Sequence, residues 1–241
     1  MKTYSITDTG VMRETNQDYF FASDDPVGSL PNLYIVADGM GGHKAGDYAS
    51  RYTTQRIVAS VSRSSGEEPV SILKEAIETA NRLLIEEAAE DETKRGMGTT
   101  VVAATIISGR LYVANVGDSR LYLVGNEMRQ ITRDHSLVAE MVRIGEMEAV
   151  AAKVHPDKNI ITRAIGAAAH VEADFFEVDL VPQNRILLCT DGLTNMVDDS
   201  AIRDMVMEED PIEERVEKLI YAANRAGGKD NITVMIIEPF S

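Results

Sequence analysis

Short β-type runs come in groups along this chain, and pairs of helices separate the groups. The run at Leu33–Ala37 is apolar at every position, which is typical of a strand buried on both faces. Further strands are predicted at Tyr4–Thr7, Tyr19–Ala22, Thr99–Ile107, Leu111–Val116, Ser119–Val124, Met128–Ile131, Ala173–Leu180, Arg185–Thr190 and Ile232–Glu238. This order favours a layered α+β protein over a repeated βαβ unit.

Helices are predicted where apolar residues recur at helical spacing or where Pro and Gly are missing. The ranges are Asp47–Ser62, Glu67–Ala89, Leu137–Ile144, Ser200–Met207 and Pro211–Arg225. Between residues 99 and 131, the turn dipeptides Ser108-Gly109, Gly117-Asp118 and Gly125-Asn126 separate successive strands, which predicts an antiparallel meander.

Composition limits the class of protein. The 241 residues contain no repeat or linker-like stretch, so we expect a single domain over 1–241, with a mobile insertion at about 136–168. The net charge of −15 argues against electrostatic binding to nucleic acid or to an anionic membrane. Cys189 is the only cysteine, and neither a signal peptide nor a membrane-spanning run is visible. We therefore expect a cytoplasmic protein.

Aspartates stand at the ends of several predicted strands, often beside glycine. They are Asp18, Asp38, Asp118, Asp191 and Asp230. Carboxylates in such places can converge on one rim of a sheet, and glycine lets a ligand approach the backbone closely. An all-oxygen ligand set selects Mg²⁺ or Mn²⁺, and a pair of these ions can activate water against a phosphoryl group. One Asp-Gly dipeptide alone is better explained as a turn, but five such aspartates together favour metal-assisted hydrolysis.

Seven blocks of the sequence carry a resemblance to a known family. They are Arg13–Asp18, Ala37–His43, Gly96–Thr100, Val116–Arg120, Asp134–Ser136, Thr190–Gly192 and Gly228–Asn231. In this order they resemble the signature blocks of the metal-dependent PP2C/PPM serine/threonine protein phosphatases, of which the bacterial single-domain branch is most similar. The resemblance implies a β-sandwich of two antiparallel sheets flanked by helix pairs, in α-β-β-α layers. It also implies a dinuclear Mn²⁺ or Mg²⁺ centre, with the insertion at 136–168 as a flap near the active-site cleft.

The resemblance also implies a role for each metal-binding residue. Asp38 would bridge two ions, and the carbonyl group of Gly39 would bind one of them. Asp191 and Asp230 would complete the shell of one ion, while Asp18 would act mainly through bound water.

A third ion is often present in bacterial relatives, and Asp118 and Asp191 would be its ligands here. Five aspartates contribute about −5 to the cleft, and two divalent ions return about +4. The site should therefore bind phosphate only when it holds metal.

Arg13 and Asp38 are the catalytic residues that the resemblance implies, with Arg13 binding the substrate phosphate through its planar fork. His43 is a candidate proton donor, because Met40 occupies the place where some relatives have a histidine after Asp-Gly. A loop histidine that only contacts backbone or solvent is an equally good interpretation of His43. Gln17 stands where many relatives have Glu, so one acidic group beside the metal ligands is missing. We expect this difference to change the properties of the site only modestly.

Other residues have structural interpretations. Ser136 is expected to cap the helix that follows it, whereas the role of Asp134 is left open between capping and the cleft. Arg163 could face the cleft, but an ion pair is the commoner use of a lone arginine. Cys189 is expected to be a buried, inert thiol.

The sequence thus predicts a phosphatase that hydrolyses phosphoserine and phosphothreonine in proteins by direct attack of water. Its expected partners are phosphorylated proteins, including a bacterial Ser/Thr kinase, and we expect a monomer. One alternative is a catalytically silent phosphopeptide-binding domain, against which Asp38, Asp191 and Asp230 argue as a retained ligand set. Another is a metallohydrolase of small phosphate esters.

Overall fold

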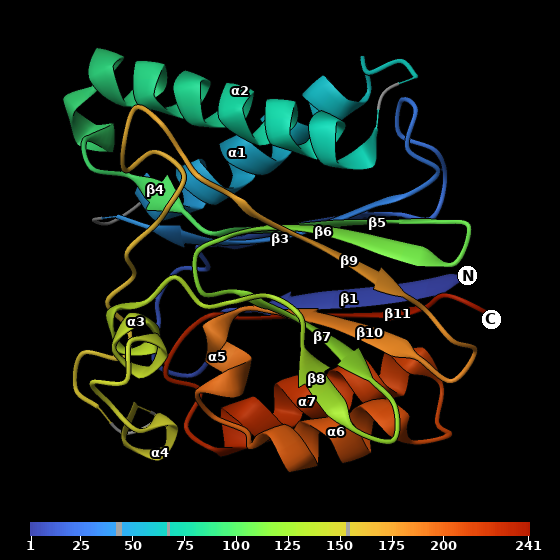
Figure 1. Cartoon of the computed structure of the whole chain (residues 1–241). Coiled ribbons are helices and arrows are strands. Elements are labelled where there is room, and N and C mark those ends of the chain that lie inside the picture. The colour runs from blue at the N-terminus through green and yellow to red at the C-terminus, as the bar shows by residue number, and fades with distance from the viewer. Residues whose placement is uncertain (42–44, 67, 153–154) are drawn as a thin grey trace.

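Two antiparallel sheets lie face to face in the computed structural model, which describes residues 1–41, 45–66, 68–152 and 155–241 (Figure 1). The first sheet has the order β1-β11-β10-β7-β8, with β1 at Lys2–Asp8, β11 at Ile232–Glu238, β10 at Arg185–Cys189, β7 at Arg120–Val124 and β8 at Met128–Gln130. The second has the order β2-β3-β5-β6-β9, with β2 at Asp18–Ser23, β3 at Leu33–Met40, β5 at Val101–Ile107, β6 at Arg110–Val116 and β9 at Asp174–Asp179. The short strand β4 (Gly98–Thr99) also pairs with β3.

Helices cover both outer faces of the sandwich (Figure 1). The second sheet carries α1 (Ala45–Val61) and α2 (Pro69–Glu90), and the 3₁₀ helix η1 (Glu92–Lys94) follows α2. The first sheet carries α5 (Asp191–Thr194), α6 (Asp199–Met207) and α7 (Ile212–Arg225). Two short helices, α3 (Leu137–Arg143) and α4 (Ala149–Ala152), lie at the end of the sandwich away from the chain termini (Figure 1). In the described ranges, no helix combines the length and the apolar character needed to cross a membrane.

Strand β3 shows why the layers form. Leu33, Ile35 and Ala37 pack in the cluster that the second sheet shares with α1 and α2, whereas Tyr34 and Val36 pack in the cluster between the two sheets. Because neighbouring side chains of a strand point to opposite faces, an unbroken apolar run suits a strand covered on both sides. The predicted sandwich with helix pairs on both faces is confirmed.

The predicted meander is wrong at Gly117-Asp118. Strand β6 before this dipeptide belongs to the second sheet and β7 after it to the first, so the chain crosses between sheets instead of forming a hairpin. Gly117 has a φ of +106°, which explains the glycine but does not decide where the next strand pairs. The turns at Ser108-Gly109 and Gly125-Asn126 do join antiparallel neighbours.

The flap segment (136–168) is joined to the sandwich at β4, and its first residue pairs with a later part of the same segment. Isolated β-bridges join Ser136 to Ile161 and Thr99 to Ile165. The Ser136 hydroxyl accepts a hydrogen bond of 3.3 Å from the Ala139 amide at the start of α3, so the predicted cap is confirmed. The mobility of this segment stays a prediction.

Candidate metal centre

The structure brings the five predicted aspartates together. Asp18 and Asp38 lie directly opposite each other on β2 and β3. The pKa of Asp38 is raised well above 3.8, first by burial and then by the negative charges of the other four aspartates, Asp18, Asp191, Asp118 and Asp230. Carboxylates that repel one another in this way have a strong electrostatic preference for a bound cation.

Asp18 connects the two sheets at this cluster. Its Oδ2 accepts hydrogen bonds from the hydroxyl groups of Thr190 (2.8 Å), which follows β10, and Thr233 (2.7 Å), which lies in β11. Burial nevertheless raises the pKa of Asp18 to about 7. Its Oδ1 is buried and has no hydrogen-bond partner among the described residues. An orphaned carboxylate oxygen beside further carboxylates fits a cation or its bound water.

Two other aspartates have raised pKa values. Burial, followed by the charge of Asp191, raises the pKa of Asp118 to about 7, and burial, followed by Asp230, raises that of Asp191 to about 6. Within the described ranges, no three His, Cys, Asp or Glu side chains form a ready-made cage for one ion.

The backbone of Asp38 is fixed by the Gly96–Thr100 block. Its N–H donates to Thr100 Oγ1 (2.9 Å), and its carbonyl oxygen accepts from Thr99 Oγ1 (2.9 Å) and from the Thr100 amide (2.8 Å). Gly39 follows inside β3 and touches the start of α1, because a Cβ at this position would lie 2.0 Å from the Gly46 carbonyl oxygen. The block thus holds Asp38 in place, and only glycine fits at the next residue.

His135 holds the loop that carries Asp118. The amide of Gly117 donates to His135 Nδ1 (3.1 Å), and the amide of His135 donates back to the Gly117 carbonyl oxygen (3.0 Å). Burial, followed by the charge of Arg163, lowers the pKa of His135, so the ring is neutral near pH 7 and its proton is on Nε2, 3.4 Å from Asp174 Oδ2. The sequence analysis missed this residue, although it stands inside one of the seven blocks.

Asn231 holds the loop that carries Arg13. Its amide oxygen accepts from the Gln17 N–H (2.8 Å), and its Nδ2 donates to the carbonyl oxygens of Thr9 and Thr15 (both 2.9 Å). On the same loop, Arg13 Nη2 donates to Asp230 Oδ2 at 2.7 Å, and 51 % of the Arg13 side chain is exposed. The structure therefore places Arg13 at the cluster with a surface that a substrate can reach.

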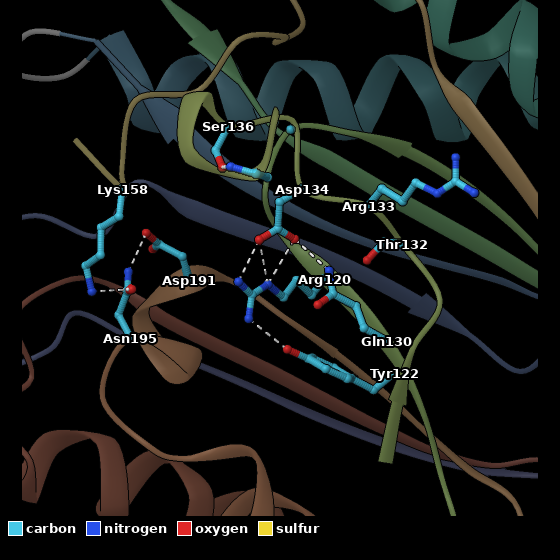
Figure 2. Close-up of polar contacts among 12 residues, drawn as sticks. Arg120, Tyr122, Gln130, Thr132, Arg133, Asp134, Ser136, Lys158, Asp191 and Asn195 are labelled. Carbon is cyan, nitrogen blue, oxygen red and sulfur yellow. Dashed lines mark hydrogen bonds and ion pairs between the residues drawn. The ribbon is translucent and has the colours of Figure 1, made fainter. Parts of the chain in front are cut away.

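A second group of polar side chains lies beside Asp191 (Figure 2). Arg120 donates to both carboxylate oxygens of Asp134, with Nη2–Oδ2 at 2.6 Å, and to Tyr122 Oη at 2.9 Å. Gln130 also donates to Asp134, at 2.6 Å. Asp134 is thus the ion-pair partner of Arg120 and not a helix cap, whereas its role at the cleft stays a prediction.

Lys158 and Asn195 reach Asp191 from the other side (Figure 2). Lys158 Nζ donates to Asn195 Oδ1 (2.8 Å), and Asn195 Nδ2 donates to Asp191 Oδ2 (2.8 Å). The sequence analysis missed both residues. For Asn195 a signal exists, because residues four apart on a helix lie side by side.

The remaining predictions have mixed outcomes. Arg163 pairs with Asp174 at 2.9 Å, so the ion-pair interpretation is the one that the structure supports. Cys189 is buried, and burial raises the pKa of its thiol to about 12, as expected for an unreactive cysteine. His43 lies outside the described residues, so its role stays a prediction.

Known proteins similar to this chain are phosphatases. A family model described as Protein phosphatase 2C matches residues 12–232. The chain is 40 % identical over 239 residues to the serine/threonine phosphatase stp of Listeria welshimeri, a match that covers 96 % of this chain and 93 % of that protein. The crystal structure of serine/threonine phosphatase Stp1 from Staphylococcus aureus matches with a TM-score of 0.92 at 34 % identity, over 98 % of this chain and 93 % of the other. The catalytic domain of the phosphatase PstP, crystallised with 2 manganese ions, matches with a TM-score of 0.85 at 30 % identity, over 98 % and 96 % of the two chains.

Proposed function

This chain belongs to the protein phosphatase 2C family of serine/threonine phosphatases, and from that premise we propose that it works at a dinuclear Mn²⁺ or Mg²⁺ centre built on its five clustered aspartates. Its substrates are phosphoserine and phosphothreonine side chains of proteins. Water attacks the phosphorus atom directly, and no covalent phosphoenzyme forms.

Each aspartate has a proposed task in holding the ions. Asp38 lies opposite Asp18 and among the other carboxylates, which suits a ligand shared by two ions. The carbonyl group of Gly39 and the carboxylates of Asp191 and Asp230 complete the protein's share of the ligands. Asp18 contributes mainly through water, as the orphaned Oδ1 suggests.

A third ion is proposed at Asp118 and Asp191, because the negative charge of Asp191 contributes to the raised pKa of Asp118. When bound, the ions lower the pKa of the attacking water and neutralise the substrate phosphate. Arg13 binds the phosphate oxygens from the exposed side, where its guanidinium group supplies parallel donors. His43 is kept as a candidate proton donor for the leaving oxygen.

The observation that carries this proposal is the cluster of mutually repelling carboxylates where the two sheets meet, of which Asp18 is buried and the other four are partly buried. A silent binding domain would gain nothing from these charges, which cost stability when no cation is present. The arrangement is therefore best understood as a cation site that serves catalysis.

The biological setting is also a proposal. We place the whole chain, 1–241, in one phosphatase domain with the flap segment beside the cleft, acting as a monomer. The protein would oppose a Ser/Thr kinase in the cytoplasm, a reducing compartment in which the single thiol of Cys189 stays reduced.

The direct test is hydrolysis of a phosphothreonine peptide by chelator-stripped protein, with and without added Mn²⁺. We expect turnover only with the metal, and we expect Asp38→Asn to abolish it while the fold is retained. Asp179→Asn is the matched control, since it makes the same chemical change at an exposed carboxylate paired with Arg110. Turnover of a small ester such as p-nitrophenyl phosphate is measured in parallel. Comparison of the two rates separates a protein phosphatase from a hydrolase of small phosphate esters.

Two results would contradict the proposal. Turnover that persists at full rate after removal of the metal would exclude the dinuclear centre. Near-normal activity of Asp38→Asn with Mn²⁺ would remove Asp38 from the position of shared ligand.

A further inference from the structure

We propose that Lys158 of the flap segment is a positioning residue that acts through Asn195 on Asp191, and so couples this segment to the metal centre. The inference rests on the proposed function, because Asp191 is one of the proposed ligands. It concerns the side chains of Lys158 and Asn195, whose contacts form a chain of hydrogen bonds that ends at Asp191 (Figure 2).

The chemistry of the three groups fixes the direction of each hydrogen bond. An ammonium group only donates, so the end of the Asn195 amide that faces Lys158 must be its oxygen. The NH₂ end must then face Asp191, where it occupies Oδ2 at 2.8 Å. A carboxylate held at one oxygen has its other oxygen directed elsewhere, which is how outer hydrogen bonds orient metal ligands.

The scaffold on the Asn195 side is rigid. Asn195 ends helix α5, and its own N–H donates to the Asp191 carbonyl oxygen at 2.8 Å. The two side chains are therefore one helical turn apart on a fixed backbone. What this helix cannot fix is the side-chain rotamer of Asn195, and Lys158, from a different part of the chain, holds the Asn195 amide oxygen so that its NH₂ group stays on Asp191.

If Lys158 acted only through its positive charge, its removal would change the affinity for metal in the opposite direction. An ammonium group near a cation site repels the incoming ion, so removing a bare charge should tighten metal binding. Removing a positioning contact should weaken it, because the Asn195 side chain then loses one of its two hydrogen bonds and holds Asp191 Oδ2 less firmly. The sign of the change therefore separates the two explanations.

The test is isothermal titration calorimetry with Mn²⁺ alone on chelator-stripped protein. Lys158→Met keeps the length of the side chain and removes the donor, and we expect the affinity for Mn²⁺ to fall about tenfold. Lys158→Arg keeps a cationic donor and should restore most of the affinity. The matched control is Arg143→Met, which removes a positive charge of the same segment that pairs with Glu140 at the surface.

A double-mutant cycle shows whether Lys158 acts through Asn195. Asn195→Leu alone should weaken Mn²⁺ binding about tenfold, and Lys158→Met should then have no further effect. Additive losses would overturn the relay. If Asn195→Leu does not fold, the comparison of Lys158→Met with Lys158→Arg and Arg143→Met still decides the matter.

The outcomes also separate this inference from the proposed function. If the unmodified protein binds no Mn²⁺, the proposed metal centre itself fails. If it binds Mn²⁺ and Lys158→Met leaves the affinity unchanged or raises it, only the relay fails. A weaker affinity that Lys158→Arg restores supports the relay.

Discussion

Raising the pH should destabilise the metal-free protein, because its buried aspartates must then release protons that they hold at lower pH. The pKa values of Asp18 and Asp118 are raised from 3.8 to about 7, mainly by burial. Between pH 3.8 and about pH 7, the folded chain therefore holds protons on these aspartates that the unfolded chain has released. Stability is therefore greatest near the unfolded pKa and is lost as the pH rises through the folded pKa of about 7.

The size of the effect follows from the same values. A folded pKa about 3 above the unfolded one corresponds to roughly 4 kcal/mol for one carboxylate. The aspartates share their repulsion and titrate together, so their costs do not simply add, and we expect a total loss of roughly 4 kcal/mol, of which roughly 3 kcal/mol falls above pH 5. For a chain of this length, that lowers Tm by roughly 10 °C. His135 has the opposite effect on stability. Its pKa is lowered in the folded state, so it contributes stability as the pH rises toward 6.5.

The assay is thermal unfolding in the presence of a chelator, from about pH 5 to about pH 8. Asp38→Asn serves as the comparison, since it removes one carboxylate from the cluster and leaves His135 unchanged; its Tm should fall less over this range. Saturating Mn²⁺ should restore stability to the unmodified protein at high pH and do much less for the variant. A metal-free protein whose Tm is flat or rises, or a variant with the same slope, would refute the idea of a repelling cluster.

Three further predictions test other contacts. Arg13→Ala should raise KM for a phosphopeptide about tenfold and lower kcat less, because one charged hydrogen bond to the ground-state phosphate is lost; a pure kcat effect in steady-state kinetics would contradict this. Gly39→Ala should cost about 3 kcal/mol or more in urea unfolding, because the new Cβ would meet the carbonyl oxygen of Gly46 at 2.0 Å and neither backbone can give way cheaply; near-normal stability would be the contrary result. Cys189 should resist a thiol reagent in the folded protein and react at once in denaturant, as its buried thiol requires.

The aspartate cluster could be predicted from the sequence because local signals mark its members. Asp38 and Asp191 each follow an apolar strand and precede a glycine, and both properties are visible without a structure. Gly117-Asp118 shows the limit of such signals. The positive φ of Gly117 is a local property of the turn, which the Gly-Asp dipeptide predicts. The sheet that β7 joins depends instead on pairing with β10, which lies far along the chain.

Side-chain partners were harder to predict because they come from distant segments. Arg120 and Asp134 are 14 residues apart, and nothing in their spacing indicates an ion pair. Lys158 lies in a part of the flap segment without a regular period, so no pattern states where its side chain points. The clustered aspartates were therefore easier to predict from the sequence than the residues that hold them in place.

The pairing of β1 with β11 determines how the protein resists mechanical force. These strands are antiparallel, and the pair Lys2–Glu238 stands at one end of the ladder while Asp8–Ile232 stands at the other. A force applied to the two ends of the chain would separate the hydrogen-bonded pairs one after another, starting at Lys2–Glu238. The opening would reach Thr7 and Thr233 near its end, where their hydroxyl groups lie 2.8 Å apart and Thr233 also donates to Asp18. The force needed for the last step would then depend on whether the neighbouring carboxylates hold a cation.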